Sequence, residues 1–135
     1  MNDLLNRDAV DLAAMIARRE ISATELMEAT LARIAEVNPK LNAIVSMIDS
    51  EAAMEMARAA DRGPVKGPMH GLPLAIKDLA DAKGLPTTMG SPAYKDAGPA
   101  PKDDIMVARM RAAGALIVGK TNTPEFGLGS HTYNP

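Results

Sequence analysis

The sequence predicts an α/β fold, in which N-terminal helices precede the first strands of a mixed, partly parallel sheet. Two short apolar runs, Leu72–Ile76 and Ala115–Val118, have the length of buried strands. Between them lies a helix that Asp104 is predicted to cap and Gly114 to end. A strand, a helix and a second strand in this order are typical of a right-handed parallel crossover, because parallel strands need a long connection.

The N-terminal part of the chain is predicted to be mainly helical. Asp8–Arg19 places its apolar residues at helical spacing. Ser22, with Glu25 three residues later, forms the pattern of a capping box and begins a second helix. Asn38 and Pro39 are predicted to end that helix, because the residue before a proline is pushed out of the α region.

Two further elements complete a helical layer with one strand over residues 1–66. Leu41–Ile48 is partly β-branched and bounded by turn residues, which favours a strand, and Ser50–Arg62 reads as an alanine-rich helix. Residues 67–135 form a strand, loop, helix and strand unit, whose loop, Ala82–Lys102, is rich in glycine and proline. Both segments are expected to belong to a single domain, since 135 residues with 47% hydrophobic content suit one core.

The composition excludes several classes of function. A net charge of -2 offers little attraction for nucleic acid, and two tyrosines, one phenylalanine and no tryptophan leave few platforms for stacking bases. The absence of cysteine excludes disulfides and thiolate chemistry, and two histidines are too few for a histidine-rich metal cluster. No cofactor or metal is expected. The acidic, polar start and the lack of an apolar run of ~20 residues predict a cytoplasmic protein without a membrane span.

A phosphate-loop pattern occurs at Gly114–Thr121, which reads G-x-x-x-x-G-K-T. That motif needs a flexible loop around the phosphate and then a helix that begins at the lysine and threonine. Here the four variable positions are Ala-Leu-Ile-Val, which favour a strand, and Pro124 follows soon after. We interpret the match as accidental.

Lys77 ends the apolar run of the first predicted sheet strand. A buried lysine loses its charge more easily, and a neutral amine can take a proton from a hydroxyl nucleophile. The alternative is a structural lysine, either extended to solvent or paired with a carboxylate. Neighbouring strand residues point to opposite faces, which argues against Asp78 as that partner. Ser91 or Thr88 could be the nucleophile of a lysine dyad, or could only make hydrogen bonds within turns. The polar residues that follow Lys77 are Asp78, Lys83, Thr87, Thr88 and Ser91.

A third polar group follows the second of these strands. Thr123, Pro124 and Glu125 form a good helix start, with threonine at the N-cap and proline at the first helical position. The polar residues from Lys120 onward are predicted to emerge beyond the carboxyl end of that strand, where open α/β sheets place ligand sites. A supporting role near a site is therefore expected.

Several blocks, in one order and with one spacing, resemble the amidase signature family. The blocks are Gly71–Asp78, Gly84–Ser91, Asp104–Ala115 and Gly119–Phe126, with Ile21–Leu26 and Val37–Ala43 before them. The resemblance covers essentially the whole chain. It implies the α/β core of that family, of which the chain would carry the incomplete N-terminal portion.

By position, Lys77 matches the catalytic lysine of this family, which deprotonates a bridging serine that in turn activates the nucleophilic serine for attack on an amide carbonyl. No other catalytic residue can be transferred. Both serines, with the oxyanion-hole amides, belong to a glycine- and serine-rich block that follows the region resembled by His131–Pro135. Ser46, Ser91 and Ser130 match neither serine.

The resemblance implies a small-molecule amide substrate and hydrolysis of carbon–nitrogen bonds other than peptide bonds. The family includes the glutamine-hydrolysing subunit of the tRNA-dependent amidotransferase, although Thr123–Glu125 resembles the general amidases more. Two hypotheses stay open: an N-terminal piece of a hydrolase that is inactive alone, and a non-catalytic or vestigial module that binds a partner. The expected partner is the missing C-terminal portion or a complementing chain, and a homo-oligomer is a further possibility.

An incomplete sheet also has a consequence for stability. A sheet cut after two or three strands leaves an unpaired edge and would expose apolar faces that the missing part covers. We expect marginal folding or self-association. The side chains expected on those faces are Leu74, Ile76, Leu116 and Val118.

Overall fold

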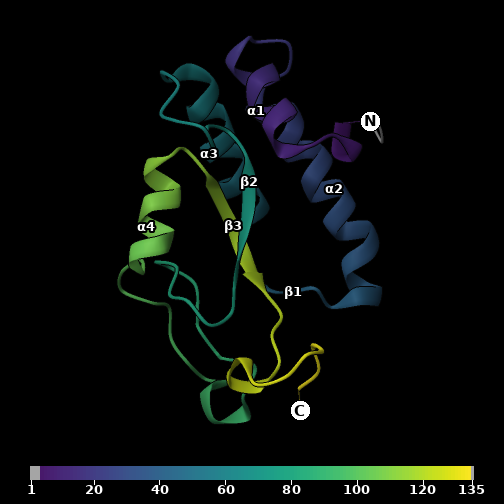
Figure 1. The fold of residues 1–135 in the computed structure, drawn as a ribbon, viewed down its shortest axis with the longest axis vertical. Coiled ribbons are helices and arrows are strands. Elements are labelled where there is room, and N and C mark those ends of the chain that lie inside the picture. The colour runs from purple at the N-terminus through teal and green to yellow at the C-terminus, as the bar shows by residue number, and fades with distance from the viewer. Residues whose placement is uncertain (1–3, 135) are drawn as a thin grey trace.

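The structure is a computed structural model that describes residues 4–134, and it has helices packed on both faces of a small sheet (Figure 1). The α-helices are α1 (Ala9–Ala17), α2 (Ala23–Leu41), α3 (Ser50–Arg62) and α4 (Ile105–Ala112). The strands are β1 (Ile44–Met47), β2 (Pro73–Lys77) and β3 (Leu116–Thr121). Three short 3-10 turns are η1 (Leu4–Asn6), η2 (Pro92–Tyr94) and η3 (Glu125–Gly127).

The sheet has three strands in the order β1-β3-β2. The central strand, β3, pairs with β2 in parallel and with β1 in antiparallel fashion, so the predicted mixed and partly parallel sheet is confirmed. The long connection from β2 to β3 contains α4, as the strand, helix and strand pattern predicts. The carboxyl ends of β2 and β3 meet at one edge, where Lys77 lies opposite Thr121.

The predicted helix starts at Ser22 and Ser50 are confirmed. Ser22 accepts a hydrogen bond from the backbone N–H of Glu25 at 3.0 Å, and the Glu25 carboxylate accepts one from the backbone N–H of Ser22 at 2.8 Å. This is a complete capping box, so two amides at the helix start are satisfied. Asp49 caps α3 in a similar way, through the backbone N–H of Glu51 at 2.9 Å. Asp104, by contrast, stands at the N-cap of α4 without a side-chain cap and instead accepts from the backbone N–H of Asp81 at 2.9 Å.

The predicted end of α2 at Asn38 and Pro39 is wrong, because the helix continues through Pro39 to Leu41. A proline this close to the end removes only one intrahelical hydrogen bond, and the helix stops within one turn. The termination comes from Asn42, which adopts the left-handed conformation with φ 46°. Asn38 instead uses its side chain to bind both backbone groups of Ile44, at 2.8 and 2.9 Å, and so fixes the start of β1.

Two clusters of buried side chains lie on opposite faces of the sheet. Val118 of β3 packs against α2 and α3 through Met27 and several alanines. Ile76 and Ile117 pack against Val107 of α4 on the other face. The expectation of exposed strand faces is therefore wrong for Ile76 and Val118, each 2% exposed, because helices from within the chain cover them. Leu74 and Leu116 are half-buried.

Strand β3 extends three residues beyond the predicted end at Val118. Gly119 lets β1 approach closely, since a Cβ at this position would stand 2.5 Å from the carbonyl oxygen of Ser46. Only a glycine fits there without a shift of the backbone. The extension carries Lys120 into the interior of the fold, where its side chain is 0% exposed.

Candidate active site

Lys77 is the last residue of β2 and stands at the carboxyl edge of the parallel pair. Open α/β sheets bind their ligands beyond this edge. The expectation of a buried Lys77 is wrong for the described residues, because its side chain is exposed, whereas Ile76 before it and Asp78 after it are 2% and 1% exposed. The alternation of side chains along a strand produces this contrast. Within residues 4–134, the amine of Lys77 makes no hydrogen bond or ion pair, so it is accessible to groups that approach this edge.

A buried ion pair lies directly beside Lys77. The Nζ of Lys120 is 3.0 Å from Oδ1 of Asp78, and the two side chains are 0% and 1% exposed. Lys120 also donates to the carbonyl oxygen of Pro86 at 3.0 Å and to the hydroxyl of Thr87 at 2.8 Å. Its ammonium group therefore has three acceptors, which is what a charge removed from water requires.

The second partner of the Asp78 carboxylate is Thr88. The hydroxyl of Thr88 donates to Oδ2 at 2.5 Å, and its backbone N–H lies 3.2 Å from both carboxylate oxygens. The backbone N–H of Asp78 in turn donates to the carbonyl oxygen of Thr121 at 3.0 Å. The network thus joins the ends of β2 and β3 to the loop around residues 86–88, and it fixes the backbone on which Lys77 stands.

The expectation that Asp78 does not neutralise Lys77 agrees with this geometry. The sequence-based prediction missed Lys120 as the partner of Asp78, because it ended the strand at Val118 and placed Lys120 beyond it. The sequence did contain a signal for a longer strand: Lys120 follows the apolar run that ends at Val118, and Gly119 is the only residue between the two. A strand continued by two residues would have pointed Lys120 toward the core.

The hydroxyl groups proposed for a lysine dyad have structural partners instead. Ser91 donates to Oε1 of Glu125 at 2.7 Å and is the N-cap of η2. The hydroxyl of Thr88 is committed to Asp78, and no hydrogen bond within residues 4–134 joins Lys77 to either side chain. The geometry favours the turn role for both. Lys83 is exposed, and its backbone N–H binds the Asp103 carboxylate at 2.7 Å.

The predicted helix start at Thr123 is wrong. Pro124 precedes only the short turn η3, and Phe126 within it has a φ of 54°, which no α-helix accepts. The hydroxyl of Thr123 donates to the carbonyl oxygen of Pro124 at 3.1 Å rather than accepting from a helix amide. The side-chain amide of Asn134 folds back and donates to the carbonyl oxygen of Thr123 at 2.8 Å.

The phosphate-loop interpretation fails, as the sequence indicates. The residues that would wrap a phosphate form β3, and Lys120 is held by Asp78 in the core.

An open pocket of about 390 Å³ lies at the carboxyl edge of the parallel strands, and its lining includes Asp78, Thr88, Ser91 and Asn122. Asp78 of the ion pair and the loop residues Pro86 and Thr88 thus line this pocket, whereas Lys77 and Lys120 do not.

Two further observations concern cofactors and membranes. Among residues 4–134, no three histidine, aspartate or glutamate side chains come together in a group that could hold a metal ion. In the same part of the chain, no helix combines the length and the apolar character that a membrane span requires.

Comparison with known proteins identifies the family. The mixed sheet, with a lysine at the end of a parallel strand, defines a partial α/β domain with a candidate site at its carboxyl edge. The sequence profile described as Amidase matches residues 25–135. The chain belongs to the amidase family.

Relatives with different activities are about equally similar to the chain. A glutamyl-tRNA(Gln) amidotransferase subunit from Acidothermus cellulolyticus is 46% identical over 99% of this chain. An indoleacetamide hydrolase from Bradyrhizobium diazoefficiens is 45% identical over 94% of it. The crystal structure of the native peptide amidase from Stenotrophomonas maltophilia matches 94% of the chain with a TM-score of 0.81 and 35% identity.

The match covers only a part of each relative. This chain spans 27% of the amidotransferase subunit, 25% of the indoleacetamide hydrolase and 27% of the peptide amidase. The chain spans about a quarter of the length of the proteins that it resembles.

Proposed function

We propose that this chain is the N-terminal part of an amide-bond hydrolase in which Lys77 is the general base. The observation that carries the proposal is the position of Lys77, exposed at the carboxyl edge of the parallel pair and fixed by the buried Asp78–Lys120 pair. Membership in the amidase family supports hydrolysis of carbon–nitrogen bonds.

The proposed role of Lys77 follows from the acid–base chemistry of an amine. Its neutral form takes the proton of a bridging serine, which takes the proton of the nucleophilic serine as that oxygen attacks the amide carbonyl carbon. The proton returns to the nitrogen of the leaving amine when the carbon–nitrogen bond breaks. By the resemblance, both serines and the oxyanion hole come from a block that follows the region of His131–Pro135, so this chain supplies the base and not the nucleophile.

The substrate class is a small-molecule amide. The amidotransferase subunit and the indoleacetamide hydrolase differ by one percentage point in identity to this chain, so overall identity does not favour either activity. Glutamine and aryl amides are therefore the substrates to test first.

A second candidate function is a non-catalytic module that binds a partner. Large apolar side chains are exposed near the end of the chain: Phe126 (46%), Leu128 (82%) and Tyr133 (80%). A structure solved as part of a vestigial protein complex, which reveals the origins of an s-triazine catabolic enzyme, matches 89% of the chain with a TM-score of 0.80 and 35% identity.

Reading the DNA downstream of the Pro135 codon distinguishes the two candidates. An in-frame or neighbouring block rich in glycine and serine supports the hydrolase. The chain is then assayed alone and together with the downstream polypeptide, with aliphatic amides, aryl amides and glutamine as substrates. We expect turnover only for the combination, and loss of that turnover on Lys77→Ala, since removing a member of such a catalytic set costs several powers of ten in rate.

Turnover by the isolated chain that disappears on Lys77→Ala would contradict the assignment of the nucleophile to the downstream block. A downstream sequence without any glycine- and serine-rich block would favour the partner-binding module instead.

A further inference from the structure

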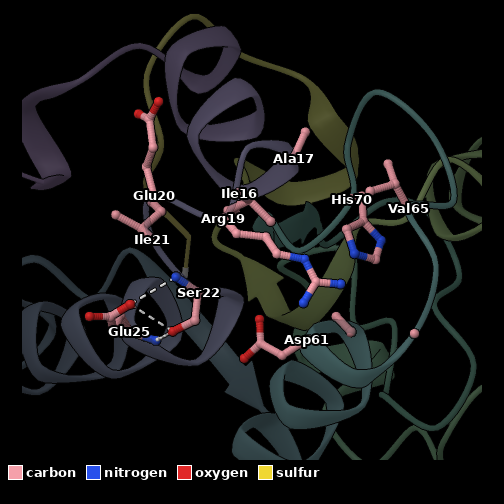
Figure 2. A pocket seen from close by; sticks show the side chains of 12 residues that line it. Ile16, Ala17, Arg19, Glu20, Ile21, Ser22, Glu25, Asp61, Val65 and His70 are labelled. Atoms are coloured by element: carbon pink, nitrogen blue, oxygen red, sulfur yellow. Dashed lines mark hydrogen bonds between the residues drawn. The ribbon is translucent and has the colours of Figure 1, made fainter.

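A second pocket, of about 280 Å³, lies at the amino end of β2, the end opposite to Lys77. It is formed by the turn between α1 and α2, the last residues of α3 and the loop that leads to β2 (Figure 2). Part of its wall is apolar and consists of Ile16, Ala60 and Val65. Charged and polar side chains complete the lining, and their hydrogen bonds decide what the pocket can bind.

Arg19 enters this pocket from an unusual backbone conformation. Its φ is 59°, a left-handed value that side chains other than glycine and asparagine rarely adopt. Figure 2 shows its guanidinium group between Asp61 and His70. Within residues 4–134, no hydrogen bond or ion pair is made by this group. This conformation ends α1, because the backbone N–H of Arg19 donates to the carbonyl oxygen of Ile16 at 3.0 Å and that of Glu20 to the carbonyl oxygen of Met15 at 2.9 Å. Glycine is the residue that this position accepts with least strain.

His70 lines the same pocket and is only 6% exposed. Its Nδ1 accepts a hydrogen bond from the backbone N–H of Lys66 at 3.3 Å. The hydrogen of the neutral ring is therefore on Nε2, which is a donor. Nε2 has no hydrogen-bond partner within residues 4–134. Every fully buried side-chain nitrogen or oxygen in this part of the chain has a partner, so Nε2 is not fully buried and opens into accessible space.

The acidic residues of the lining already have partners. Asp61 accepts from the backbone N–H groups of Ala23 and Thr24, at 2.7 and 3.1 Å, which places its charge at the positive end of α2. Glu25 belongs to the capping box, and Glu20 pairs with Arg18 at 2.6 Å. Among the described residues of the lining, Arg19 is thus the only lysine or arginine, and its guanidinium group has no hydrogen-bond partner or counterion within residues 4–134.

We propose that this pocket binds a small organic carboxylate. The carboxylate oxygens accept hydrogen bonds from the Arg19 guanidinium and from Nε2–H of His70. A short aliphatic chain then lies against Ile16, Ala60 and Val65. A planar guanidinium group favours a carboxylate because two parallel hydrogen bonds can form, and the apolar wall favours an organic acid over inorganic phosphate.

Nuclear magnetic resonance tests this proposal with butyrate, acetate and inorganic phosphate at constant ionic strength. The titrated protein is the polypeptide that the whole gene encodes, and also the 135-residue chain if its amide spectrum is dispersed. The signals followed are the Nε–H of Arg19 and the ring of His70. We expect saturable shifts with butyrate, weaker binding of acetate, and the weakest response to phosphate.

The matched variants are Arg19→Gly and Arg33→Gln. Each removes one positive charge, but Arg33 lies on the exposed surface of α2 and pairs with Glu36. Arg19→Gly should weaken butyrate binding by about tenfold or more, as expected for the loss of a charge-assisted pair. The same variant should raise the melting temperature, since it relieves the left-handed strain. Arg33→Gln should leave the affinity unchanged.

The melting temperature separates a loss of binding from a loss of folding, because the binding-deficient variant is expected to be the more stable one. Absence of a saturable response in the folded polypeptide would overturn the proposal, as would unchanged butyrate affinity in Arg19→Gly. Phosphate affinity equal to or higher than that of butyrate would overturn the assignment to organic carboxylates.

Discussion

Two lysines at neighbouring strand ends show how position decides the role of one residue type. Lys77 ends β2 with its amine exposed, while Lys120, paired in register with Ile76, is 0% exposed and held by three acceptors. A buried ammonium group must stay paired, because leaving it without a counterion costs far more than the pair contributes. Lys120 therefore belongs to the framework, and Lys77 is free for chemistry.

The general-base role of Lys77 predicts that arginine is not a substitute. In the enzyme completed by its downstream polypeptide, Lys77→Arg and Lys77→Ala should both lose several powers of ten in kcat, since a guanidinium group does not release its proton near neutral pH. Both variants should melt near the wild-type temperature, because the side chain is exposed. Steady-state kinetics and thermal melts of both proteins check this. Near-normal turnover of the arginine variant would refute the role.

The buried pair predicts a large loss of stability when either partner is removed. Lys120→Met or Asp78→Asn should lower the free energy of unfolding by about 3 to 5 kcal/mol, because the remaining group stays buried without its counterion. Lys83→Met is the matched control, and this exposed lysine should change stability by less than about 0.5 kcal/mol. Urea denaturation of the three variants provides the comparison. Equal effects for Lys120→Met and Lys83→Met would show that the pair is not important for the fold.

At the scale of elements, capping groups determine where the helices begin. The capping box at the start of α2 predicts that Ser22→Ala lowers the free energy of unfolding by about 1 kcal/mol, since the backbone N–H of Glu25 loses its acceptor. Ser50→Ala is a useful comparison, because Ser50 follows the N-cap Asp49 and its hydroxyl makes no hydrogen bond within the described part of the chain. Chemical denaturation measures both. A cost for Ser50→Ala as large as that for Ser22→Ala would exclude the capping explanation.

The same capping box predicts a pH dependence. Hydrogen bonds from the backbone N–H and then the hydroxyl of Ser22 lower the pKa of Glu25 from its ordinary value of 4.5. When the pKa of a carboxyl group is lower in the folded than in the unfolded protein, its ionised form stabilises the fold at pH values above the unfolded-state pKa. This contribution is lost as the pH falls through the lower, folded-state pKa. Melting curves from about pH 6 to about pH 3 should therefore fall less steeply for Glu25→Gln than for the wild type. Parallel curves would contradict this.

The sequence predicted the elements whose determinants are local. Ser50–Arg62 agrees with the observed α3 to the residue, because a cap and helical spacing lie within the segment itself. The predicted end of α2 at Asn38 is wrong for a local reason, since Pro39 is tolerated in the last turn and Asn42 ends the helix.

Two other errors fall where contacts distant in the sequence decide. Lys120 can lie in a buried strand because its ammonium group pairs with the carboxylate of Asp78, 42 residues earlier in the sequence. The turn at Thr123 depends on Asn134, which holds its carbonyl oxygen. The role of Lys77 rests on the family resemblance and stays a prediction.

At the scale of the whole molecule, the two ends of the sheet differ. Helix α1, the start of α2 and the end of α3 lie at the amino end of β2, whereas loops and the end of the described chain lie at the carboxyl end (Figure 1). The large apolar side chains Phe126 and Leu128 are exposed in this second region. An exposed apolar patch on a soluble protein favours association, with a partner or with another copy.

This asymmetry predicts self-association of the isolated chain through its carboxyl end. Leu128→Ser should shift the chain toward the monomer in light scattering at rising concentration, because it removes an apolar side chain that is 82% exposed. Val10→Ser is the matched control, since Val10 is 79% exposed but lies on α1, and it should leave the association unchanged. Addition of the downstream polypeptide should suppress the association of the wild type by covering the same side chains. A wild-type chain that stays monomeric at every concentration, or equal effects of the two substitutions, would show that the carboxyl end is not the associating surface.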